Sequence, residues 1–470
     1  MVEYGKVDGG ALAKLESAVG SDNISTREED RYCYSRDTTL FSNPPEAIVR
    51  PQNTQQVSAV LKLANQARIP VTPWGAGTSA SGSPVPIKGG ILLDMGAMDE
   101  IIQIDPDNLV ATVEPGLICD ALNEALAKHG FFFPPDPASS PSATIGGMVA
   151  CNASGNRAIK YGTTKDHILA LEVVLPTGEV INTGSKNLKS VAGFDLTRLM
   201  VGSEGSLGVI TKITLKITPL PEHYASALMI YKSIDELARA AVKVRRARIV
   251  PSMLEFMNTK TTSAAFKYAG LQGLPEGCFL LVDCDGARES VDKTLDRCVE
   301  ICKTEGPVHS ERATDPAYRD KLISARKAAL PALARLRPTT CMEDCTVPVT
   351  KLSQAAVMIE RIPKKLPVEG FDLANFGHLG DGNMHPTFIF DENVQAQREA
   401  FFKSLDTLYN EIVLPMGGSI TGEHGIGLIR APYMEAELGT RATRLMRDLK
   451  KLFDPNLILN PGKGKGGPYP

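Results

Sequence analysis

A glycine-rich loop early in the chain constrains the fold more than any other feature, because it matches a known fingerprint in a context that excludes the usual structure. Residues 71–84 read VTPWGAGTSASGSP, and Gly75, Gly77 and Ala80 formally satisfy the G-x-G-x-x-A pattern of dinucleotide-binding Rossmann folds. That pattern requires a helix directly after the loop. Here Ser-Gly-Ser-Pro follows, and then Pro86, so a stable helix cannot begin there. The sequence therefore argues against a Rossmann fold.

The same loop suits a different kind of anion site. Successive backbone N–H groups can form a concavity for an anion, and the two glycines permit positive φ and the close approach of a diphosphate. Thr78 and Ser79 add hydroxyl donors. A glycine-rich turn without a ligand explains this loop alone equally well. Further glycine-rich loops at 143–155 (ATIGGMVACNASG) and 193–211 (GFDLTRLMVGSEGSLGVIT) favour one large ligand that is contacted at several points.

The spacing of apolar residues divides the chain into segments, and 470 residues exceed what one hydrophobic core can organise. Residues 1–40 read as a helical lead-in. From 41 to 220, short runs rich in Val and Ile alternate with Gly/Pro turns and predict strands, with helices after Asn53 and from about Cys119 to His129. The longer helix-like stretches SIDELARAAVKVRRA, ESVDKTLDRCVEICK and AQREAFFKSLDTLYNEI, with strands between them, predict a second, α+β domain.

Composition and charge exclude several classes of function. The net charge is -3, so the overall field gives no indication of nucleic-acid binding. The N-terminal stretch lacks the basic and apolar regions of a signal peptide, and no apolar run approaches the roughly 20 residues that span a bilayer. Nine cysteines, an odd number without the run of an iron–sulfur site, predict reduced thiols. We expect a cytoplasmic protein with no transmembrane segment and no nucleic-acid partner.

Three of the seven histidines lie in short glycine-rich segments near the C-terminus. His378 and His385 lie in GHLGDGNMH, and His424 follows Glu423 in GEHG. On a straight strand the first two would face opposite sides, because seven is odd and the period is two, but GDGN allows a turn that lets them converge. With Glu423 they would form a two-histidine, one-carboxylate site with open positions, suited to Zn, Mn or Fe(II). One such histidine alone reads best as a loop residue bonded to backbone, whereas the combined pattern favours a divalent metal.

The motifs in combination indicate a family. The chain carries WGAGTSASG, PPDPASSPSATIGGMVACNASG, DLTRLMVGSEGSLGVIT, GHLGDGNMH, GGSITGEHGIG and LNPGK. From about Tyr34 to Lys463 it resembles the FAD-linked oxidoreductases of the vanillyl-alcohol-oxidase type. Among them it is most similar to the group of D-lactate dehydrogenase, the glycolate oxidase flavoprotein subunit and D-2-hydroxyglutarate dehydrogenase. The resemblance implies an α+β fold with a two-subdomain FAD-binding domain at 41–220, an α+β cap domain carrying the metal site at 221–450, and a segment at 451–470 that returns to the FAD domain.

The resemblance places the FAD contacts on the glycine-rich loops. The first loop would hold the diphosphate, the second would line the flavin, the third would contact the adenosine side, and the C-terminal LNPGK would return to the cofactor. The residues implied are Pro73, Gly75, Ala76, Gly77, Thr78, Ser79, Pro135, Asp136, Ser140, Gly146, Gly147, Asn152, Ser154, Gly155, Glu204, Gly205, Ile210 and Asn460. Some members attach FAD covalently through a histidine near the diphosphate loop. No histidine precedes His129 here, so we predict non-covalent FAD.

The resemblance also assigns catalytic residues. It matches His378, His385 and Glu423 to the metal ligands, and Arg326 to an arginine that pairs with the substrate carboxylate, for which a guanidinium fork is suited. Oxidation of a 2-hydroxy acid removes a hydride from the α-carbon, which flavin N5 can accept, and a proton from the α-hydroxyl. A metal on that oxygen lowers its pKa. His424 is the candidate base, because imidazole titrates in the useful range.

The substrate and the electron acceptor are less sharply indicated. Members specific for D-2-hydroxyglutarate carry further polar residues after the arginine, whereas Leu330 and Met342 stand at the approximately corresponding positions, which favours D-lactate or glycolate. A D-2-hydroxyglutarate dehydrogenase, a non-catalytic flavin subunit that relays electrons, and a non-redox member like alkyl-dihydroxyacetone-phosphate synthase stay open as alternatives. We expect a protein electron acceptor, either an electron-transferring flavoprotein or an iron–sulfur subunit, and a homodimer is a candidate oligomeric form.

Overall fold

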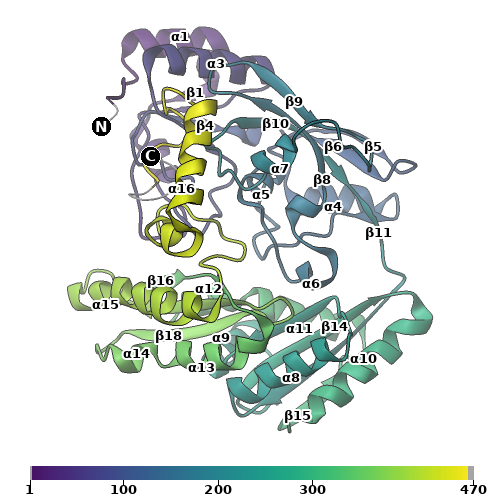
Figure 1. The fold of residues 1–470 in the computed structure, drawn as a ribbon. Helices are drawn as coiled ribbons and strands as arrows, with labels where there is room; N and C mark the ends of the chain where they lie inside the picture. The colour runs from purple at the N-terminus through teal and green to yellow at the C-terminus, as the bar shows by residue number, and fades with distance from the viewer. Residues whose placement is uncertain (1–2, 464–470) are drawn as a thin grey trace. The chain divides into compact units, whose positions relative to one another are not determined.

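The computed structural model describes residues 3–463, and within them the chain divides into two compact units (Figure 1). Unit 1 contains the described residues of Met1–Ser154, Thr163–Leu220 and Glu423–Pro470, and unit 2 contains Gly155–Gly162 and Pro221–Gly422. Residues 423–450 therefore pack with unit 1, whereas the sequence placed them in the second domain. The reason is that backbone N–H groups at 426–429 bind Glu204 and the Ser81 carbonyl. Residues 464–470 of the expected C-terminal segment lie outside the described residues.

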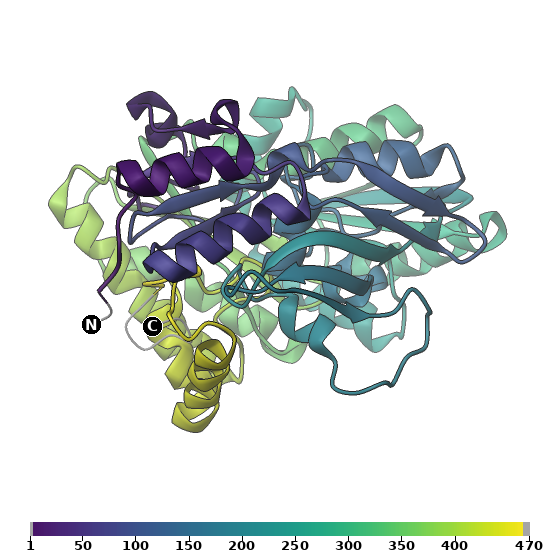
Figure 2. The ribbon, with the colours of Figure 1, turned by 90° about the horizontal axis from the view of Figure 1, so that it is seen from above.

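The N-terminal part of unit 1 forms a sheet in the order β1-β2-β4-β3, in which β4 runs parallel to β2 and β3. Helices α1 and α3 pack side by side (Figure 2). The Asn53 side chain caps α3 by accepting a hydrogen bond from Gln56 N, so this helix begins where the sequence predicted. The elements are α1 (Gly9–Val19), β1 (Ile24–Ser25), α2 (Glu28–Cys33), β2 (Ala47–Val49), α3 (Thr54–Ala67), β3 (Val71–Trp74) and β4 (Ile91–Asp94).

Turns, rather than a helix, connect β3 to β4 through the first glycine-rich loop. The exclusion of a Rossmann βαβ unit is therefore confirmed. Asp94, which stands where that fold would use a ribose-binding carboxylate, instead accepts hydrogen bonds from Gly96 N at 3.0 Å and from the Tyr34 hydroxyl at 2.7 Å.

The rest of unit 1 contains an antiparallel sheet in the order β5-β6-β10-β8-β9. Its inner face packs on α4 and α5 in a core that includes Leu122, Ile145, Leu171 and Ile213. Helix α4 ends at Ala127, two residues before the predicted end at His129, because the chain turns there with a His129 N–Leu126 O bond. The elements are β5 (Ile101–Asp105), β6 (Val110–Val113), α4 (Cys119–Ala127), β7 (Phe131–Phe132), α5 (Ile145–Cys151), β8 (Ile168–Val174), β9 (Val180–Gly184), α7 (Leu196–Met200), β10 (Val209–Lys216) and β11 (Thr218–Pro219).

Unit 2 is built on one long sheet in the order β15-β12-β14-β13-β18-β19-β16, with β17 also paired to β19. Its strands are β12 (His223–Tyr231), β13 (Met253–Met257), β14 (Cys278–Gly286), β15 (His309–Arg312), β16 (Thr339–Met342), β17 (Cys345–Thr346), β18 (Asp372–His378) and β19 (Asn383–Phe390). Its helices are α6 (Ala158–Tyr161), α8 (Ile234–Arg246), α9 (Thr259–Ala269), α10 (Arg288–Lys303), α11 (Pro316–Lys327), α12 (Ala329–Leu333), α13 (Leu352–Glu360), α14 (Ile362–Lys365) and α15 (Gln395–Asp406).

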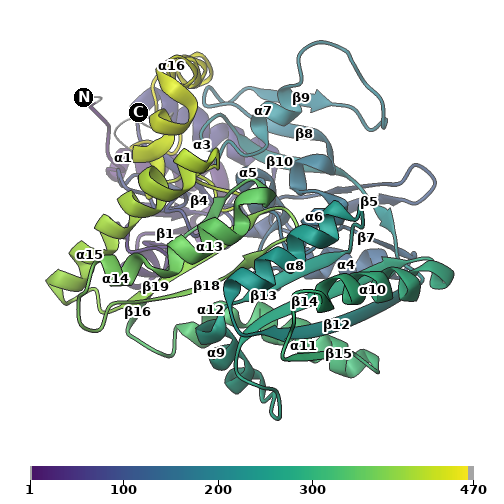
Figure 3. The ribbon, with the colours of Figure 1, turned by 60° about the horizontal axis from the view of Figure 1, so that its bottom comes forward.

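Helices cover both faces of this sheet. Helices α8, α10 and α13 pack together on one face (Figure 3). On this face the Cys298 side chain of α10 contacts Cys284 of β14. Helices α9, α11 and α12 cover the other face, in a core that includes Phe266, Phe279 and Leu322. The third predicted helix continues past α15 as a π-helical stretch, Thr407–Val413. The α+β architecture expected from the sequence is confirmed.

The C-terminal part of unit 1 contains α16 (Met434–Phe453), which is kinked at Gly439. After it, Leu459 forms a parallel bridge with Val71 at the start of β3, so the chain returns to the N-terminal sheet. Lys450, which is 1% exposed, donates hydrogen bonds to Asp454 Oδ2 at 2.5 Å and to two carbonyls, which fixes the end of the helix. Among the described residues, no helix combines the length and the apolar character that crossing a membrane requires.

Candidate functional site

A hairpin in unit 2 places His378 and His385 on the same face of the sheet. Strands β18 and β19 pair in a register that sets His378 opposite Asn383 and Phe376 opposite His385. His385 lies two residues beyond Asn383 and therefore shares its face. The two imidazole ring centroids are 5.2 Å apart, and the side chains are 9% and 3% exposed. The predicted turn at GDGN thus brings the two histidines together.

Glu255 of β13, opposite His378 in the sheet, holds two residues of this face. Each of its carboxylate oxygens lies 2.8 Å from His378 Nδ1, and Oε2 lies 2.8 Å from Arg326 Nη2. Nδ1 of His378 therefore faces this carboxylate, and Nε2 is the ring nitrogen on the other side of the imidazole. The Arg326 side chain is 4% exposed, and its guanidinium also lies over the Phe376 ring at 5.0 Å.

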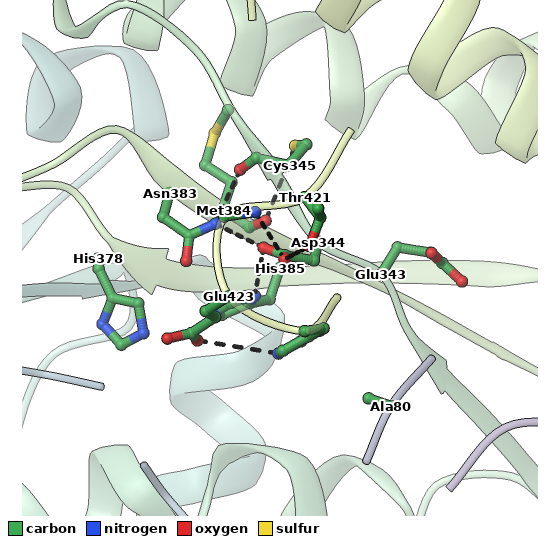
Figure 4. Close-up of polar contacts among 12 residues, drawn as sticks. Ala80, Glu343, Asp344, Cys345, His378, Asn383, Met384, His385, Thr421 and Glu423 are labelled. Carbon is green, nitrogen blue, oxygen red and sulfur yellow. Dashed lines mark hydrogen bonds and ion pairs between the residues drawn. The ribbon is translucent and has the colours of Figure 1, made fainter. Parts of the chain in front are cut away.

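Asp344 ties together the chain segments next to the histidines (Figure 4). It follows β16 and is fully buried. Its Oδ1 accepts a hydrogen bond from Asn383 Nδ2 at 2.6 Å, and its Oδ2 accepts from the Thr421 hydroxyl at 2.6 Å and from Gly422 N at 2.7 Å. His385 Nδ1 lies 3.7 Å from Oδ1. Asp344 therefore fixes both the second strand of the hairpin and the last residues of unit 2.

Glu423 and His424 follow Gly422 directly and are the first residues of the C-terminal part of unit 1. Their side chains are 12% and 13% exposed, and His424 Nε2 lies 3.8 Å from Glu423 Oε1. A peptide bond joins Gly422 to Glu423, so the Cα atoms of these two residues are about 3.8 Å apart. The position of Glu423 thus depends on the backbone that Asp344 holds.

In unit 1, the first glycine-rich loop lies against the start of α5. A Cβ atom on Gly75 would approach Thr144 Oγ1, the helix cap, to 2.5 Å, so only glycine lets the two segments meet. The predicted residues Ala76 and Thr78 are exposed on this loop, while Gly77 and Ser79 are half-buried. The loop predicted to bind the diphosphate and the segment around Thr144 predicted to line the flavin therefore lie next to each other within unit 1.

Residues near the C-terminus hold the second half of the same loop. Asn460 Nδ2 donates to Ser83 O at 2.9 Å and to Glu204 O at 2.7 Å, and Asn460 Oδ1 is buried with no hydrogen-bond partner within residues 3–463. Lys463 Nζ donates to the carbonyls of Gly82 and Val85. Burial lowers the pKa of Lys463 to about 7, opposed by the nearby carboxylates. The predicted return of this segment to unit 1 extends through Lys463.

The other predicted cofactor residues are spread over several elements. The Ile210 side chain belongs to the hydrophobic core of unit 1, and the Glu204 carboxylate binds backbone N–H groups at 426 and 427. Gly155 belongs to unit 2. Pro73 lies in β3, Gly146 and Gly147 in the first turns of α5, and Asn152 at its C-cap; Pro135, Asp136, Ser140, Ser154 and Gly205 lie in loops of unit 1.

Sequence reasoning missed Glu255 and Asp344. A signal was present for Glu255, because it is the charged residue within the apolar run MLEFM. A carboxylate within a buried strand is retained only when it is paired or hydrogen-bonded. For Asp344 the adjacent acidic pair Glu343-Asp344 gave no comparable indication, since most such pairs are solvated.

Comparisons with known proteins match both halves of the chain. Residues 45–184 match the family model described as "FAD binding domain", and residues 220–464 match "FAD linked oxidases, C-terminal domain". Over 453 residues the chain is 39% identical to the glycolate oxidase subunit GlcD of Bacillus subtilis (strain 168), covering 96% of this chain and 95% of that protein. Over 466 residues it is 34% identical to the mitochondrial D-lactate dehydrogenase (cytochrome) of Arabidopsis thaliana, covering 98% of this chain and 81% of that protein.

Solved structures with lower identity share the fold. A p-cresol methylhydroxylase with bound substrate matches with a TM-score of 0.80 at 18% identity, covering 97% of this chain and 96% of that chain. An alkyldihydroxyacetonephosphate synthase matches with a TM-score of 0.75 at 19% identity, covering 99% and 87%. At these identities the likeness shows a common architecture alone, and nothing about the reaction follows from it.

Proposed function

This chain belongs to the family of FAD-linked oxidases, and we propose that it uses FAD to oxidise a small D-2-hydroxy acid to the 2-oxo acid. The observation that carries the proposal is the face of unit 2 on which Glu255 contacts His378 and Arg326, with His385 beside His378. Two imidazoles beside a guanidinium suit a divalent metal and a carboxylate, which are what a metal-assisted 2-hydroxy-acid site requires. The relatives named as a glycolate oxidase subunit and as a D-lactate dehydrogenase support the same substrate class.

The residues of unit 1 fit FAD. Gly75 allows the diphosphate loop to lie on α5, and Ala76 and Thr78 are exposed on that loop. Asn460 Oδ1, which has no hydrogen-bond partner among the described residues, offers a buried acceptor beside the same loop. When bound, FAD would supply the acceptor for two electrons. We propose non-covalent binding, because no histidine precedes His129 in the sequence.

The residues of unit 2 fit a divalent metal. Glu255 orients His378 through Nδ1, in the carboxylate–histidine arrangement that commonly supports metal ligands. We propose that His378 and His385 act as ligands and that Glu423 is the third. Gly422, the residue before Glu423, donates its N–H to Asp344 Oδ2 at 2.7 Å, which restrains the backbone next to Glu423. When bound, Zn, Mn or Fe(II) would act as a Lewis acid that lowers the pKa of an alcohol.

Two further residues would act on the substrate directly. We propose that the Arg326 guanidinium binds the substrate carboxylate, because its planar fork suits a bidentate contact and it lies 2.8 Å from Glu255 on the same face as His378. We propose that the imidazole of His424 takes the proton of the α-hydroxyl as the α-hydrogen leaves with its electron pair. This assignment would balance the reaction, because the histidine takes one proton and FAD, when bound, would supply the acceptor for the hydrogen and its two electrons.

The surroundings of Arg326 favour a short substrate. Leu330 and Met342 pack against the apolar core on the same side of the sheet, and neither can bind a second carboxylate. We therefore propose D-lactate or glycolate, with D-2-hydroxyglutarate as the alternative. Because relatives are named as subunits of glycolate oxidase, we propose that a protein partner, either an electron-transferring flavoprotein or an iron–sulfur subunit, accepts the electrons.

Anaerobic flavin reduction tests this function directly. The holoprotein is mixed with D-lactate, glycolate, D-2-hydroxyglutarate and their L-isomers where these exist, and flavin bleaching is followed in the same sample that is analysed for metal. His424→Ala should slow bleaching by about 10²-fold or more, whereas the control His223→Ala, a partly exposed histidine of unit 2, should not. Absence of bleaching by any of these acids would favour an electron-relay subunit, and unchanged bleaching in His424→Ala would exclude the proposed base.

A further inference from the structure

Glu204 has an unusual environment for a residue expected to contact the adenosine side of FAD. It lies in the loop after α7 with φ +51, followed by Gly205 with φ +66, so two successive residues adopt left-handed conformations. Such geometry is uncommon for a residue with a side chain. Glu204 is 6% exposed. The local backbone therefore directs an acidic side chain into the interior of unit 1.

Both carboxylate oxygens of Glu204 bind the chain just after Glu423 and His424. Oε1 accepts a hydrogen bond from Ile426 N at 2.6 Å, and Oε2 accepts from Gly427 N at 3.0 Å. A Cβ atom on Gly425, which has φ +83, would approach Oε1 to 2.6 Å, so glycine is required for this close contact. Burial raises the pKa of Glu204, while the two N–H groups act in the opposite direction.

The backbone of Glu204 is tied to the segments proposed to bind FAD. Its N–H donates to Ala150 O of α5 at 2.8 Å, and its carbonyl accepts from Asn460 Nδ2 at 2.7 Å. Arg430, which is fully buried, donates from Nη1 to Ala80 O at 3.3 Å and to Gly425 O at 3.1 Å. The diphosphate loop and the 423–427 loop are therefore held by one continuous hydrogen-bonded network within unit 1.

We propose that Glu204 is a positioning residue that fixes the 423–427 loop, and with it Glu423 and His424, to the FAD-binding segments. The side chain does not act by contacting adenosine. Its carboxylate supplies two charged acceptors for a loop that otherwise has neighbouring glycines at 422, 425 and 427 and little conformational restraint. The consequence for catalysis rests on the proposed function, whereas the consequence for the loop does not.

Hydrogen–deuterium exchange of the holoprotein tests the positioning role without reference to activity. In Glu204→Gln, the amide oxygen can accept from one N–H group, while the amide NH₂ faces the other. We expect amide exchange in a peptide covering 425–430 to accelerate at least about tenfold, which corresponds to ~1.4 kcal/mol. The control Glu172→Gln, whose partners in unit 1 are Thr54, Thr211 and Lys212, should leave exchange in this peptide unchanged.

Affinity and rate measurements complete the test. The Kd for FAD of Glu204→Gln should stay within about threefold of the wild type, while the limiting rate of flavin reduction falls at least about tenfold. Unchanged exchange at 425–430, or a tenfold rise in the FAD Kd without faster exchange, would overturn the proposal. If Glu204→Gln does not accumulate, Glu204→Asp, which is too short to reach both N–H groups, gives the same readouts. Normal flavin reduction by His424→Ala would refute the base and leave the exchange result standing.

Discussion

Glu255 allows a quantitative test of how unit 2 holds its charged residues. Its carboxylate is 1% exposed and lies 2.8 Å from both Arg326 Nη2 and His378 Nδ1. Glu255→Gln keeps the size of the side chain and one acceptor oxygen but removes the charge opposite a buried guanidinium. Breaking a buried pair from one side costs about 3–5 kcal/mol, and the retained oxygen should keep the loss near the lower value. For a unit of this size, ~3 kcal/mol lowers the melting temperature by about 6–12 °C.

The same substitution should weaken metal binding. Loss of the partner that orients a metal-ligating histidine typically reduces affinity about 10–100-fold. Calorimetry gives the melting temperature, and elemental analysis after dialysis against a weak chelator gives the retained metal. Glu360→Gln is the matched control, because Glu360 is a partly buried carboxylate of unit 2 that accepts a hydrogen bond from Asn258 Nδ2 at 3.0 Å, away from His378.

The outcome distinguishes structure from site. If Glu255→Gln melts within about 2 °C of the wild type, the Arg326 charge is compensated by other groups and the energetic reasoning is wrong. If the protein is destabilised as expected but retains metal like the wild type, Glu255 holds Arg326 without supporting a metal ligand. A control that loses as much stability as Glu255→Gln would show that the effect is not specific to the ion pair.

Three further outcomes follow from the same structure. Because burial lowers the pKa of Lys463 to about 7, the unfolded chain binds more protons above that pH, and the stability of unit 1 should rise by up to about 1.4 kcal/mol per pH unit between about pH 7 and 8.5. Urea unfolding followed by Trp74 fluorescence should show this rise in the wild type and not in Lys463→Met. If the unfolding free energy changed equally with pH in both proteins, the expectation would be contradicted. Asp344→Asn should lower the free energy of unfolding by about 1–3 kcal/mol for each lost hydrogen bond from Thr421 and Gly422. Calorimetry gives this loss and metal analysis gives the retained metal; a melting temperature equal to that of the wild type would contradict it. Acid precipitation should release the flavin into the supernatant, and a yellow pellet would contradict non-covalent binding.

The paired histidines show what a sequence pattern can establish. The odd spacing of His378 and His385 excluded a straight strand as the source of a shared site, and GDGN supplied the turn that the hairpin contains. The rejection of a Rossmann unit succeeded for a similar reason, because Pro84 and Pro86 lack the backbone N–H of a helix and the serines and glycine before them have low helix propensity. Both inferences used local stereochemistry, which depends on neighbouring residues.

The supporting residues were not predictable in the same way. Glu255 precedes His378 by 123 positions, and only strand pairing makes them neighbours. The family resemblance placed Glu204 at the adenosine side of FAD, and nothing in the sequence indicated that its side chain also binds backbone N–H groups more than 200 residues later in the chain. The sequence placed the end of the second domain at residue 450, whereas unit 2 ends at Gly422. Long-range hydrogen bonds join residues 426–427 to Glu204 of unit 1, and no change in composition marks this boundary.

The reach of Lys463 across the sequence has a consequence for biosynthesis. Its ammonium binds the carbonyl of Val85, which lies 378 positions earlier. At a translation rate of about 5–20 residues per second, Lys463 is synthesised ~20–75 s after Val85, so the Val85 carbonyl lacks this partner during that time. During that interval the ribosome synthesises all of unit 2, whose residues lie between Val85 and Lys463 in the sequence. A flavin that binds before Lys463 is synthesised would meet a loop whose carbonyls lack this lysine, so we expect the coenzyme to load after Lys463 has been added to the chain.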